Sequence, residues 1–391
     1  MAVVTIVIAV VAAALILPAV SDLLCLVRSL GGRRGRAEPG TLPRLLFLVP
    51  AHNEEQLIAD CVRSLRELRY PPDRSAVFVI ADNCSDRTAE RAVANGAVCL
   101  ERHDPARPGK PRAIAWALTQ VPLNRHDAVI IIDADTTVDP GFARALSGAA
   151  PLEHKVVQAY FDVANPHDSS LTRMAAVLAA ANFRVAYPLK RRAGVNAPLL
   201  GNGMGIGVGV LAAQGWKAFT IAEDWELYAR YTAEGVPIEG VQDARLFAQE
   251  ASSLGQSSTQ RQRWTAGKLT VLVRHLGAVL RSRRIGLHQK LDAAAELSAP
   301  GPVLHLGVVI AASLAIWLFD APGAAWLVVA LWIPILRLST YALIGLAAQP
   351  DPLCAAVAFL FLPAYAAWRL ATAVISLKMV GDKPWVRTAR R

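Results

Sequence analysis

The chain has 391 residues, of which 54% are hydrophobic and only 18% are charged, and its formal net charge is +10. This composition is too apolar for an ordinary soluble enzyme, so we expect part of the chain to lie in lipid. The positive charge does not indicate nucleic-acid binding, because the basic residues cluster beside apolar runs, as they do next to membrane helices, and no nucleic-acid-binding motif accompanies them. The five cysteines show no paired spacing, which indicates reduced thiols rather than a disulfide scaffold.

The N-terminal segment is the first membrane candidate. Residues 2–20 carry no charge, and apolar character resumes at 23–27 before a basic stretch. This length is sufficient to cross a hydrocarbon core of about 30 Å. A cleaved signal peptide is the alternative interpretation, but the segment lacks a basic start, so we expect a retained anchor. The basic, Gly-rich linker that follows places the next domain in the cytoplasm by the positive-inside rule.

The middle of the chain alternates short apolar runs with helical patterns. The apolar runs predict buried strands at 45–50, 76–82 and 128–135, and the residues between them predict helices at 54–68 and 86–96. Such alternation predicts an α/β fold with a doubly wound, mostly parallel, Rossmann-like sheet. The ligand site of such a sheet lies beyond the carboxyl ends of its strands, where polar residues follow each run.

The last third is again lipid-like, with apolar stretches at 302–319, 323–348 and 353–377. The second and third contain Arg337 and Arg369, and an arginine at membrane depth usually faces protein, water or the interface. Residues 267–299 mix basic and apolar side chains, as in amphipathic helices on a membrane surface, although a plain connecting helix is the alternative. If all four segments cross, the basic C-terminal tail lies outside, against the positive-inside rule, so we expect one segment to be re-entrant or interfacial.

Asp133-Ala-Asp135, at the end of the third predicted strand, is the strongest chemical feature. Two carboxylates one residue apart can converge on a hard divalent cation such as Mg²⁺ or Mn²⁺. Such an ion would neutralise the charge that develops on a departing nucleoside diphosphate. Because this tripeptide is common by chance, its interpretation depends on the motifs around it.

Six motifs in order give the chain a resemblance to the family 2 glycosyltransferases, and in particular to the membrane branch that includes ceramide glucosyltransferase, cellulose synthase and hyaluronan synthase. The resemblance runs from Val49 to Trp264, more than half of the chain. The last motif is the most specific, because no structural rule requires Gln, Arg and Trp at its spacing. The motifs are Val49–Glu55, Ala81–Asp86, Arg107–Lys110, Asp133–Asp135, Ile221–Asp224 and Gln260–Trp264.

The resemblance implies a GT-A-like fold and a role for each motif. It makes Asp224 the catalytic base that takes the proton of the acceptor hydroxyl as this oxygen attacks the anomeric carbon, which gives inversion. It assigns nucleotide contacts to Pro50, Ala51, Glu54, Glu55, Asp82, Lys110 and Asp133, and the metal to Asp133 and Asp135. It assigns the diphosphate and acceptor to Gln260, Arg263, Trp264, Glu223 and Gly203, with the arginine as a fork and the tryptophan as a flat face.

Each of these residues also has an ordinary structural interpretation. Asn83, Ser85 and Asp86 are common in turns and helix caps, and an acidic pair such as Glu223-Asp224 suits the first turn of a helix. Lys110 could be a solvated charge, and Trp264 could lie at the membrane interface. The order of the motifs and their positions at strand ends favour the functional interpretation.

We therefore expect an inverting, metal-dependent glycosyltransferase that moves a sugar, by family default a UDP-linked hexose or N-acetylhexosamine, to a membrane lipid. A processive polysaccharide synthase is the alternative, and it would need further membrane helices from a partner subunit. A non-catalytic nucleotide-binding assembly subunit is the alternative of another class. We expect a multi-pass protein of the cell (inner) membrane. Its predicted parts are an anchor at 1–27, a basic linker at 28–42, a cytoplasmic catalytic domain at 43–266, amphipathic helices at 267–301, a membrane region at 302–378 and a basic tail at 379–391.

Overall fold

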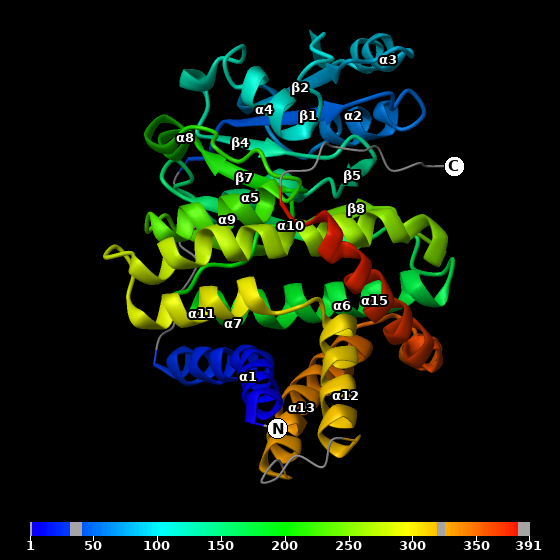
Figure 1. The fold of residues 1–391 in the computed structure, drawn as a ribbon. Coiled ribbons are helices and arrows are strands. Elements are labelled where there is room, and N and C mark those ends of the chain that lie inside the picture. Colours follow the sequence, from blue (N-terminus) through cyan, green and yellow to red (C-terminus); the bar gives the residue numbers. More distant parts are fainter. Residues whose placement is uncertain (1, 32–40, 319–324, 382–391) are drawn as a thin grey trace.

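The computed structural model describes residues 2–31, 41–318 and 325–381. Most of the expected linker at 28–42 and of the expected tail at 379–391 therefore lies outside the described residues. The described chain forms an α/β domain with helices packed beneath it (Figure 1).

An eight-stranded sheet forms the centre of the α/β domain, in the order β3-β2-β1-β4-β7-β6-β8-β5. All strands point the same way except β7 and β5, which are antiparallel to their neighbours, so the sheet is mostly parallel, as predicted. The strands are β1 (Leu45–Ala51), β2 (Ser75–Asp82), β3 (Val98–Arg102), β4 (Ala128–Ile131), β5 (Thr136–Val138), β6 (Val156–Val163), β7 (Met204–Gly207) and β8 (Ile238–Ala248).

The first two predicted strands match β1 and β2, but the third is shorter than predicted. β4 ends at Ile131, and a backbone hydrogen bond of 3.1 Å from Thr136 to Asp133 turns the chain at the acidic motif. The apolar run continues past the strand because Ile132 and Ala134 still pack in the core. The turn leaves the two aspartates on a loop rather than on a strand.

Helices cover both faces of the sheet, which explains why its central strands are apolar without interruption. In β1, Leu45, Phe47 and Val49 pack into a core with α2 (Ile58–Arg66) and α5 (Phe142–Ser147), whereas Leu46 and Leu48 face the opposite core. This alternation follows from the two-residue period of a strand. The first core also contacts α3 (Thr88–Ala94). The opposite core contains α4 (Lys110–Ala117), α8 (Val208–Gln214), α9 (Glu223–Ala233) and parts of α10 (Leu254–Arg281) and α11 (Leu287–Ser298).

The helix α10 is a single long element that crosses beneath the sheet (Figure 1). The expected boundary between residues 266 and 267 falls inside it, so the last sequence motif and the expected amphipathic region share one helix. At Gly267 a Cβ atom would lie 2.7 Å from the Cβ atom of Ala222. Because no side chain fits there, α10 packs directly against the residues that precede α9.

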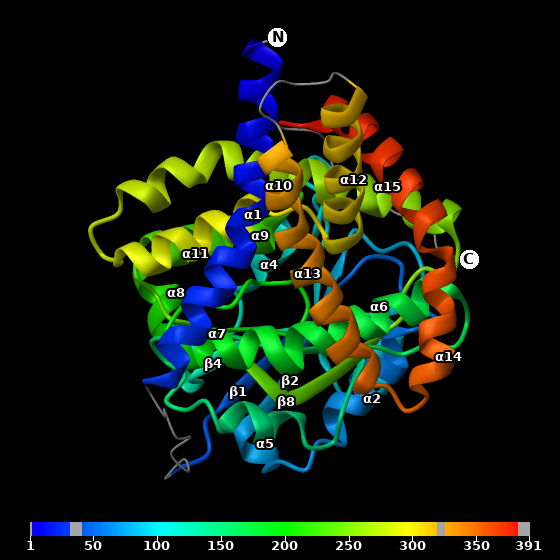
Figure 2. The same cartoon turned by 90° about the horizontal axis from the view of Figure 1, so that it is seen from below.

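Among the residues that the structure describes, three helical segments are long and apolar enough to cross a membrane: Ala9–Leu30, Val329–Ala347 and Pro352–Met379. A fourth candidate is the pair Leu287–Ser298 and Pro302–Leu318, which is bent by 82°. Figure 2 shows them together with α6 (Ser170–Ala181) and α7 (Tyr187–Ala193), which line the underside of the domain. The helices of these segments are α1 (Ala2–Leu30), α12 (Pro302–Leu318), α13 (Ala325–Ala347), α14 (Pro352–Val357) and α15 (Leu362–Ser376).

Polar contacts join the first helix to the rest of the protein. The Ser21 hydroxyl donates to Asp292 at 2.8 Å, and this buried carboxylate also accepts from Lys190 of α7. Arg337 of α13 donates to Asp22 at 2.7 Å, so this arginine faces protein. Buried charges of this kind are tolerated because they are paired, and the pairing fixes α1 against the domain.

Candidate active site

A cavity of about 830 Å³ lies between the carboxyl ends of the strands and the helices α6, α9, α10 and α15. It has two chemically different parts. The carboxylate end is lined by Asp82, Lys110, Asp133, Asp135, Glu223 and Asp224. The apolar end is lined by Leu171, Met174, Leu178, Leu297, Val303 and Tyr365.

Two loops at the edge of the cavity, after β1 and β2, are held in unusual backbone conformations. Asn53 and Asn83 have positive φ angles of 54° and 52°, which non-glycine residues seldom adopt. Both side chains are anchored, since the oxygen of Asn53 accepts from the Ser85 backbone at 2.8 Å and that of Asn83 accepts from the Asp104 backbone at 2.7 Å. Strained residues fixed in this way are typical of ligand-binding loops.

Asp82 lines the cavity, and a buried arginine that the sequence analysis missed holds it in place. The Arg102 guanidinium donates to Asp82 at 2.5 Å and to Asp104 at 2.9 Å, and the side chains of Arg102 and Asp82 are only 6% and 7% exposed. Arg102 ends β3, and the β2–β3 register pairs it directly with Asp82. The strand pairing therefore decides this contact, which no local sequence pattern reveals.

Glu55 does not line the cavity, so the nucleotide contact that the resemblance implies for it stays a prediction. Its carboxylate accepts from the Arg87 backbone at 3.2 Å, and its own backbone N–H donates to Asp86 at 3.1 Å. Asp86 also accepts from the Thr88 backbone at 3.0 Å, so it serves the start of α3, as its ordinary interpretation predicts. Burial alone would raise the pKa of Asp86, but hydrogen bonds, first of all the one that the Thr88 hydroxyl donates, lower it below its usual range.

Lys110 is the cation of the carboxylate end. Its ammonium donates to Asp133 at 2.6 Å and to the Gly201 carbonyl at 2.8 Å, and it lies 3.6 Å from Glu223. Burial opposes its charge, but the neighbouring carboxylates of Asp133 and Glu223 raise the pKa of Lys110 above its ordinary value. Lys110 therefore stays charged and bridges the acidic loop to the loop before β7.

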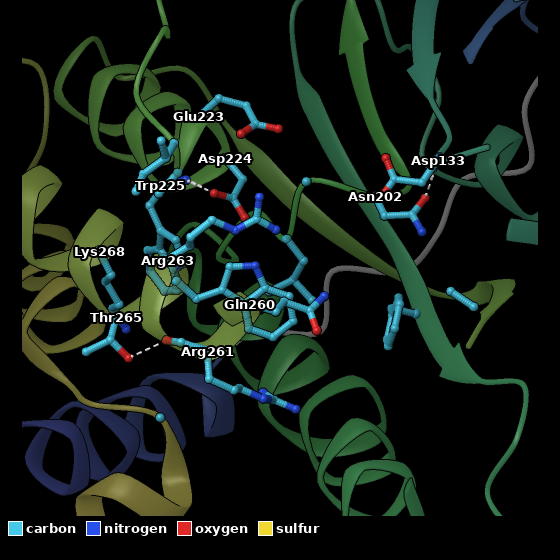
Figure 3. A pocket seen from close by; sticks show the side chains of 18 of the residues that line it. Asp133, Asn202, Glu223, Asp224, Trp225, Gln260, Arg261, Arg263, Thr265 and Lys268 are labelled. Carbon is cyan, nitrogen blue, oxygen red and sulfur yellow. Dashed lines mark hydrogen bonds between the residues drawn. The ribbon is translucent and has the colours of Figure 1, made fainter. Parts of the chain in front are cut away.

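Asn202, in the loop before β7, holds the acidic motif in place by two hydrogen bonds. Its side-chain oxygen accepts from the Asp133 backbone at 3.1 Å, and its side-chain nitrogen donates to Thr136 at 2.8 Å (Figure 3). Asn202 lies beside Gly203 in a glycine-rich run at 201–207, and the partners of its side chain could not be read from that pattern. Asn202 thereby fixes the turn that carries Asp133 and Asp135.

Asp133 and Asp135 both line the cavity, and their chemistry suits a hard divalent cation. Within the described residues, no group of three or more His, Cys, Asp and Glu side chains is arranged to hold a metal ion. Two carboxylates are nevertheless the usual protein share of a Mg²⁺ site in which substrate phosphates and water supply the other ligands. The residues present therefore fit an ion that arrives with a diphosphate.

Glu223 and Asp224 begin α9 and lie on the other side of the carboxylate end (Figure 3). Asp224 accepts from the Trp225 backbone at 2.8 Å. Removal from water, followed by repulsion from Glu223, raises the pKa of Asp224 to about 7. Burial likewise raises the pKa of Glu223, although Lys110 opposes this. A carboxylate with a pKa near neutrality is well matched to accepting a proton.

The helix α10 supplies Gln260, Arg263 and Trp264 to the cavity wall. Figure 3 shows Arg263 beside Asp224, whereas Arg261 points the other way, towards α6. The guanidinium of Arg261 donates to Glu250 at 3.3 Å and lies 4.8 Å from the centre of the Trp264 ring. Arg261 and Arg263, which belong to the same turn of α10, therefore point in different directions.

Gly203 is placed differently from the expectation. It does not line the cavity, and a Cβ atom there would lie 2.3 Å from a Leu246 methyl group and 3.0 Å from Ala159. Its φ angle is also positive, at 72°. Packing against β6 and β8, together with backbone conformation, therefore explains why this position lacks a side chain.

The structure brings all other predicted site residues to one cavity: Pro50, Ala51, Glu54, Asp82, Lys110, Asp133, Asp135, Glu223, Asp224, Gln260, Arg263 and Trp264. It adds Tyr365 and Arg369 of α15, which are more than 90 residues beyond the last motif. The signal for Arg369 was its charge within an apolar segment.

Two curated relatives and one solved structure show what the chain is similar to. It is 29% identical over 259 residues to the beta-monoglucosyldiacylglycerol synthase of Trichormus variabilis, covering 62% of this chain and 53% of that protein. It is 24% identical over 269 residues to the probable glucomannan 4-beta-mannosyltransferase 1 of Arabidopsis thaliana, covering 64% and 48%. The chain thus spans about half the length of these relatives.

The fold matches that of the mannosyltransferase PcManGT from Pyrobaculum calidifontis, solved in complex with GDP-Man and Mn²⁺. The TM-score is 0.58 at 20% sequence identity, covering 96% of this chain and 98% of that one. The family model described as glycosyltransferase like family 2 matches residues 43–267, more than half of the chain. This stretch contains every motif residue gathered at the cavity, and the chain belongs to glycosyltransferase family 2.

Proposed function

We propose that the protein transfers one sugar from a nucleotide-sugar donor to a membrane lipid, with inversion at the anomeric carbon. The observation that carries this proposal is a single cavity that joins the carboxylate end to the apolar end. The apolar end lies beside α12 and α15, which belong to candidate membrane segments. An acyl chain suits such a surface, because burying apolar area is favourable whereas burying a polysaccharide there is not.

Asp224 takes the acceptor proton in this proposal. A lone pair of the acceptor hydroxyl oxygen forms the bond to the anomeric carbon while the bond from this carbon to the diphosphate oxygen breaks. The electron pair of the broken bond leaves with the nucleoside diphosphate, and the hydroxyl proton moves to the Asp224 carboxylate. Attack opposite the leaving group gives the inverted product.

The other residues of the carboxylate end hold the donor. Asp82, fixed by Arg102, accepts a hydrogen bond from the base, and Lys110 and Arg263 place positive charge beside the diphosphate. Asp133 and Asp135 would hold Mg²⁺ or Mn²⁺, which supplies charge neutralisation for the leaving diphosphate. Asn202 and Lys110 keep the acidic loop in position while the donor binds.

The name of the similar protein, beta-monoglucosyldiacylglycerol synthase, supports a lipid acceptor and a hexose donor. A processive polysaccharide synthase is the second candidate, favoured by the likeness to a probable glucomannan mannosyltransferase. The two differ in their product, since single transfer yields a lipid with one added sugar and processive synthesis yields long chains. In the second case we expect a partner membrane subunit to complete a path for the polymer.

The proposal is tested with the purified full-length chain in detergent. UDP-glucose, UDP-N-acetylglucosamine and GDP-mannose are offered with Mg²⁺ or Mn²⁺ and a panel of lipids, and both nucleoside diphosphate release and lipid products are measured. We expect metal-dependent release and a lipid carrying one sugar. No release with any donor would overturn the proposal, and products of many sugars would favour the synthase.

Orientation belongs to the same proposal, because nucleotide sugars are made in the cytoplasm. We propose a multi-pass protein of the cell membrane with its catalytic domain on the cytoplasmic side, supported by three candidate spanning segments and basic residues after α1. A reporter fused after Gly381 tests the number of crossings. A cytoplasmic signal fits a re-entrant or interfacial fourth segment, and an external signal contradicts the positive-inside assignment.

A further inference from the structure

Three basic side chains line the cavity between its two ends. Arg261 and Lys268 lie on α10, and Arg369 reaches the same place from α15. Arg261, Thr265 and Lys268 are spaced by four and three residues, so they share one face of the helix. Arg369 meets this face directly, because its guanidinium lies 3.4 Å from the Thr265 hydroxyl.

These three cations are poorly neutralised by protein. Glu250 pairs with Arg261 at 3.3 Å, but no ion pair within 4.0 Å is made by Lys268 or Arg369 in the described part of the chain. The carboxylates of Glu296 and Asp224 act on Lys268 only from a longer distance. Lys268 donates to the Ala299 carbonyl at 2.7 Å and lies 3.9 Å from the centre of the Trp225 ring. Arg369 also donates to the Thr372 hydroxyl, at 3.4 Å.

Burial makes this imbalance costly. Arg369 is only 7% exposed, and the Nε atom of Arg261 is buried without a hydrogen-bond partner. Buried charge is normally paired, and buried donors are normally satisfied. Burial also lowers the pKa of Lys268 to about 8, although the carboxylates of Glu296 and Asp224 oppose this shift. An anionic ligand would satisfy all three groups.

The direction of Arg261 separates this anion from the proposed donor diphosphate. Arg263 lies beside Asp224, whereas Arg261 points away from Asp224 towards α6 (Figure 3). Met174, Val303 and Tyr365 line the same cavity and pack in one apolar cluster. An anion bound here therefore sits where the proposed lipid acceptor places its headgroup, with its acyl chains against the apolar end.

We propose that Arg261, Lys268 and Arg369 form a subsite for the phosphate of the acceptor headgroup, so that the acceptor is a phosphate-bearing lipid with a free hydroxyl rather than a neutral diacylglycerol. Two arginine forks and a lysine suit the tetrahedral oxygens of a phosphate. The inference rests on the proposed function, because it takes the cavity as the acceptor site.

The test measures binding of matched lipids to the full-length protein in neutral maltoside micelles. Dioleoylphosphatidylglycerol, dioleoylglycerol and inorganic phosphate are titrated calorimetrically into wild type, Arg369→Gln and Arg369→Lys. We expect the wild type to bind the phospholipid at least about tenfold more tightly than dioleoylglycerol, as one charge-assisted hydrogen bond implies. Arg369→Gln should lose this preference, and Arg369→Lys should retain most of it.

Arg173→Gln is the matched control, because it removes a cation from α6 that contacts Cys354 and does not line the cavity. It should leave the preference unchanged. Lys268→Met gives an independent variant if Arg369→Gln fails to fold, and thermal unfolding checks each protein. The inference would be overturned if the wild type bound the two lipids with equal affinity. It would also be overturned if Arg369→Gln lost the same affinity for both lipids, or if the wild type bound inorganic phosphate as tightly as the phospholipid.

Sugar transfer is measured on the same variants to separate the two proposals. If transfer proceeds equally well to both lipids in the wild type and in Arg369→Gln, the phosphate subsite is wrong and the proposed function stands. If no donor turns over, the proposed function fails. The measured preference for the phospholipid over dioleoylglycerol still supports or contradicts an anionic subsite in that case.

Discussion

The two ends of the cavity are built in opposite ways. The carboxylate end comes from the loops after β1, β2 and β4 and the start of α9, and direct hydrogen bonds such as those of Lys110 and Asn202 tie these elements together. The apolar end comes from α6, α12 and α15 with the residues before them, and it is held mainly by side-chain packing. The proposed donor site is therefore encoded in short motifs, whereas the proposed acceptor site depends on the assembly of distant helices.

Asp224→Asn tests the carboxylate end most severely. Because the amide cannot accept the acceptor proton, we expect turnover to fall about a thousandfold. Donor affinity, measured by titration with the nucleotide sugar, should stay within a few-fold of wild type. Asp60→Asn, a surface carboxylate that pairs with Arg63, is the control and should keep full activity. Unchanged turnover in Asp224→Asn would favour a non-catalytic assembly subunit.

Asp135→Asn should act on the same end through the metal. We expect kcat/KM for the donor to fall about a hundredfold, since several kcal/mol of charge neutralisation depend on the ion. The loss should be partly recovered at high Mn²⁺ concentration, which a titration of activity against metal would reveal. A variant with unaltered metal dependence would remove Asp135 from the metal site.

The pH profile distinguishes the base from its neighbour. Asp224 must be deprotonated to act, and its pKa is about 7, so we expect turnover to fall as the pH drops through 7. The charged groups that influence it are Glu223, Lys110 and Lys268. Glu223→Gln removes a charge that repels the Asp224 carboxylate, so it should move the acidic limb of the turnover profile to lower pH by roughly one pH unit. Glu234→Gln, at the exposed end of α9, should leave it in place, and a limb unmoved by Glu223→Gln would contradict the coupling.

Leu178→Asn tests the apolar end and should have the smallest effect. The new side chain has a similar shape but places an amide among acyl chains, so we expect the KM for the lipid to rise about threefold to tenfold. Donor hydrolysis without acceptor should not change. Val93→Asn, at an exposed position of α3, provides the control. Equal effects on donor and lipid would mean that the two ends are not separable.

The sequence predicted the carboxylate end well because its chemistry lies at the ends of short apolar runs. Strands β1 and β2 and the start of α9 follow from local patterns, and the family match confirms the class of protein, whereas the turn at the acidic motif was predicted as strand. Arg102 could not be found in this way, since it reaches Asp82 only through the β2–β3 register. Glu55 is the opposite case: it belongs to a sequence motif, but its carboxylate accepts a hydrogen bond from the backbone at the start of α3.

The apolar end was largely invisible to sequence analysis. The charge of Arg369 within an apolar segment indicated that it faces protein, water or the interface, but not which. Its neighbour Thr265 is 104 residues away in the chain. Contacts between helices so far apart depend on packing angles and on close approaches such as Gly267 against Ala222, which apolar periodicity does not specify.

The continuity of α10 has a consequence for acceptor choice. Arg263, which faces the reaction centre, and Lys268, which faces the proposed phosphate, are five residues apart on one helix. With a rise of 1.5 Å per residue, they are separated by about 8 Å along its axis. Because α10 is one continuous helix, it holds the proposed donor contact of Arg263 and the proposed acceptor contact of Lys268 at a constant spacing along its axis.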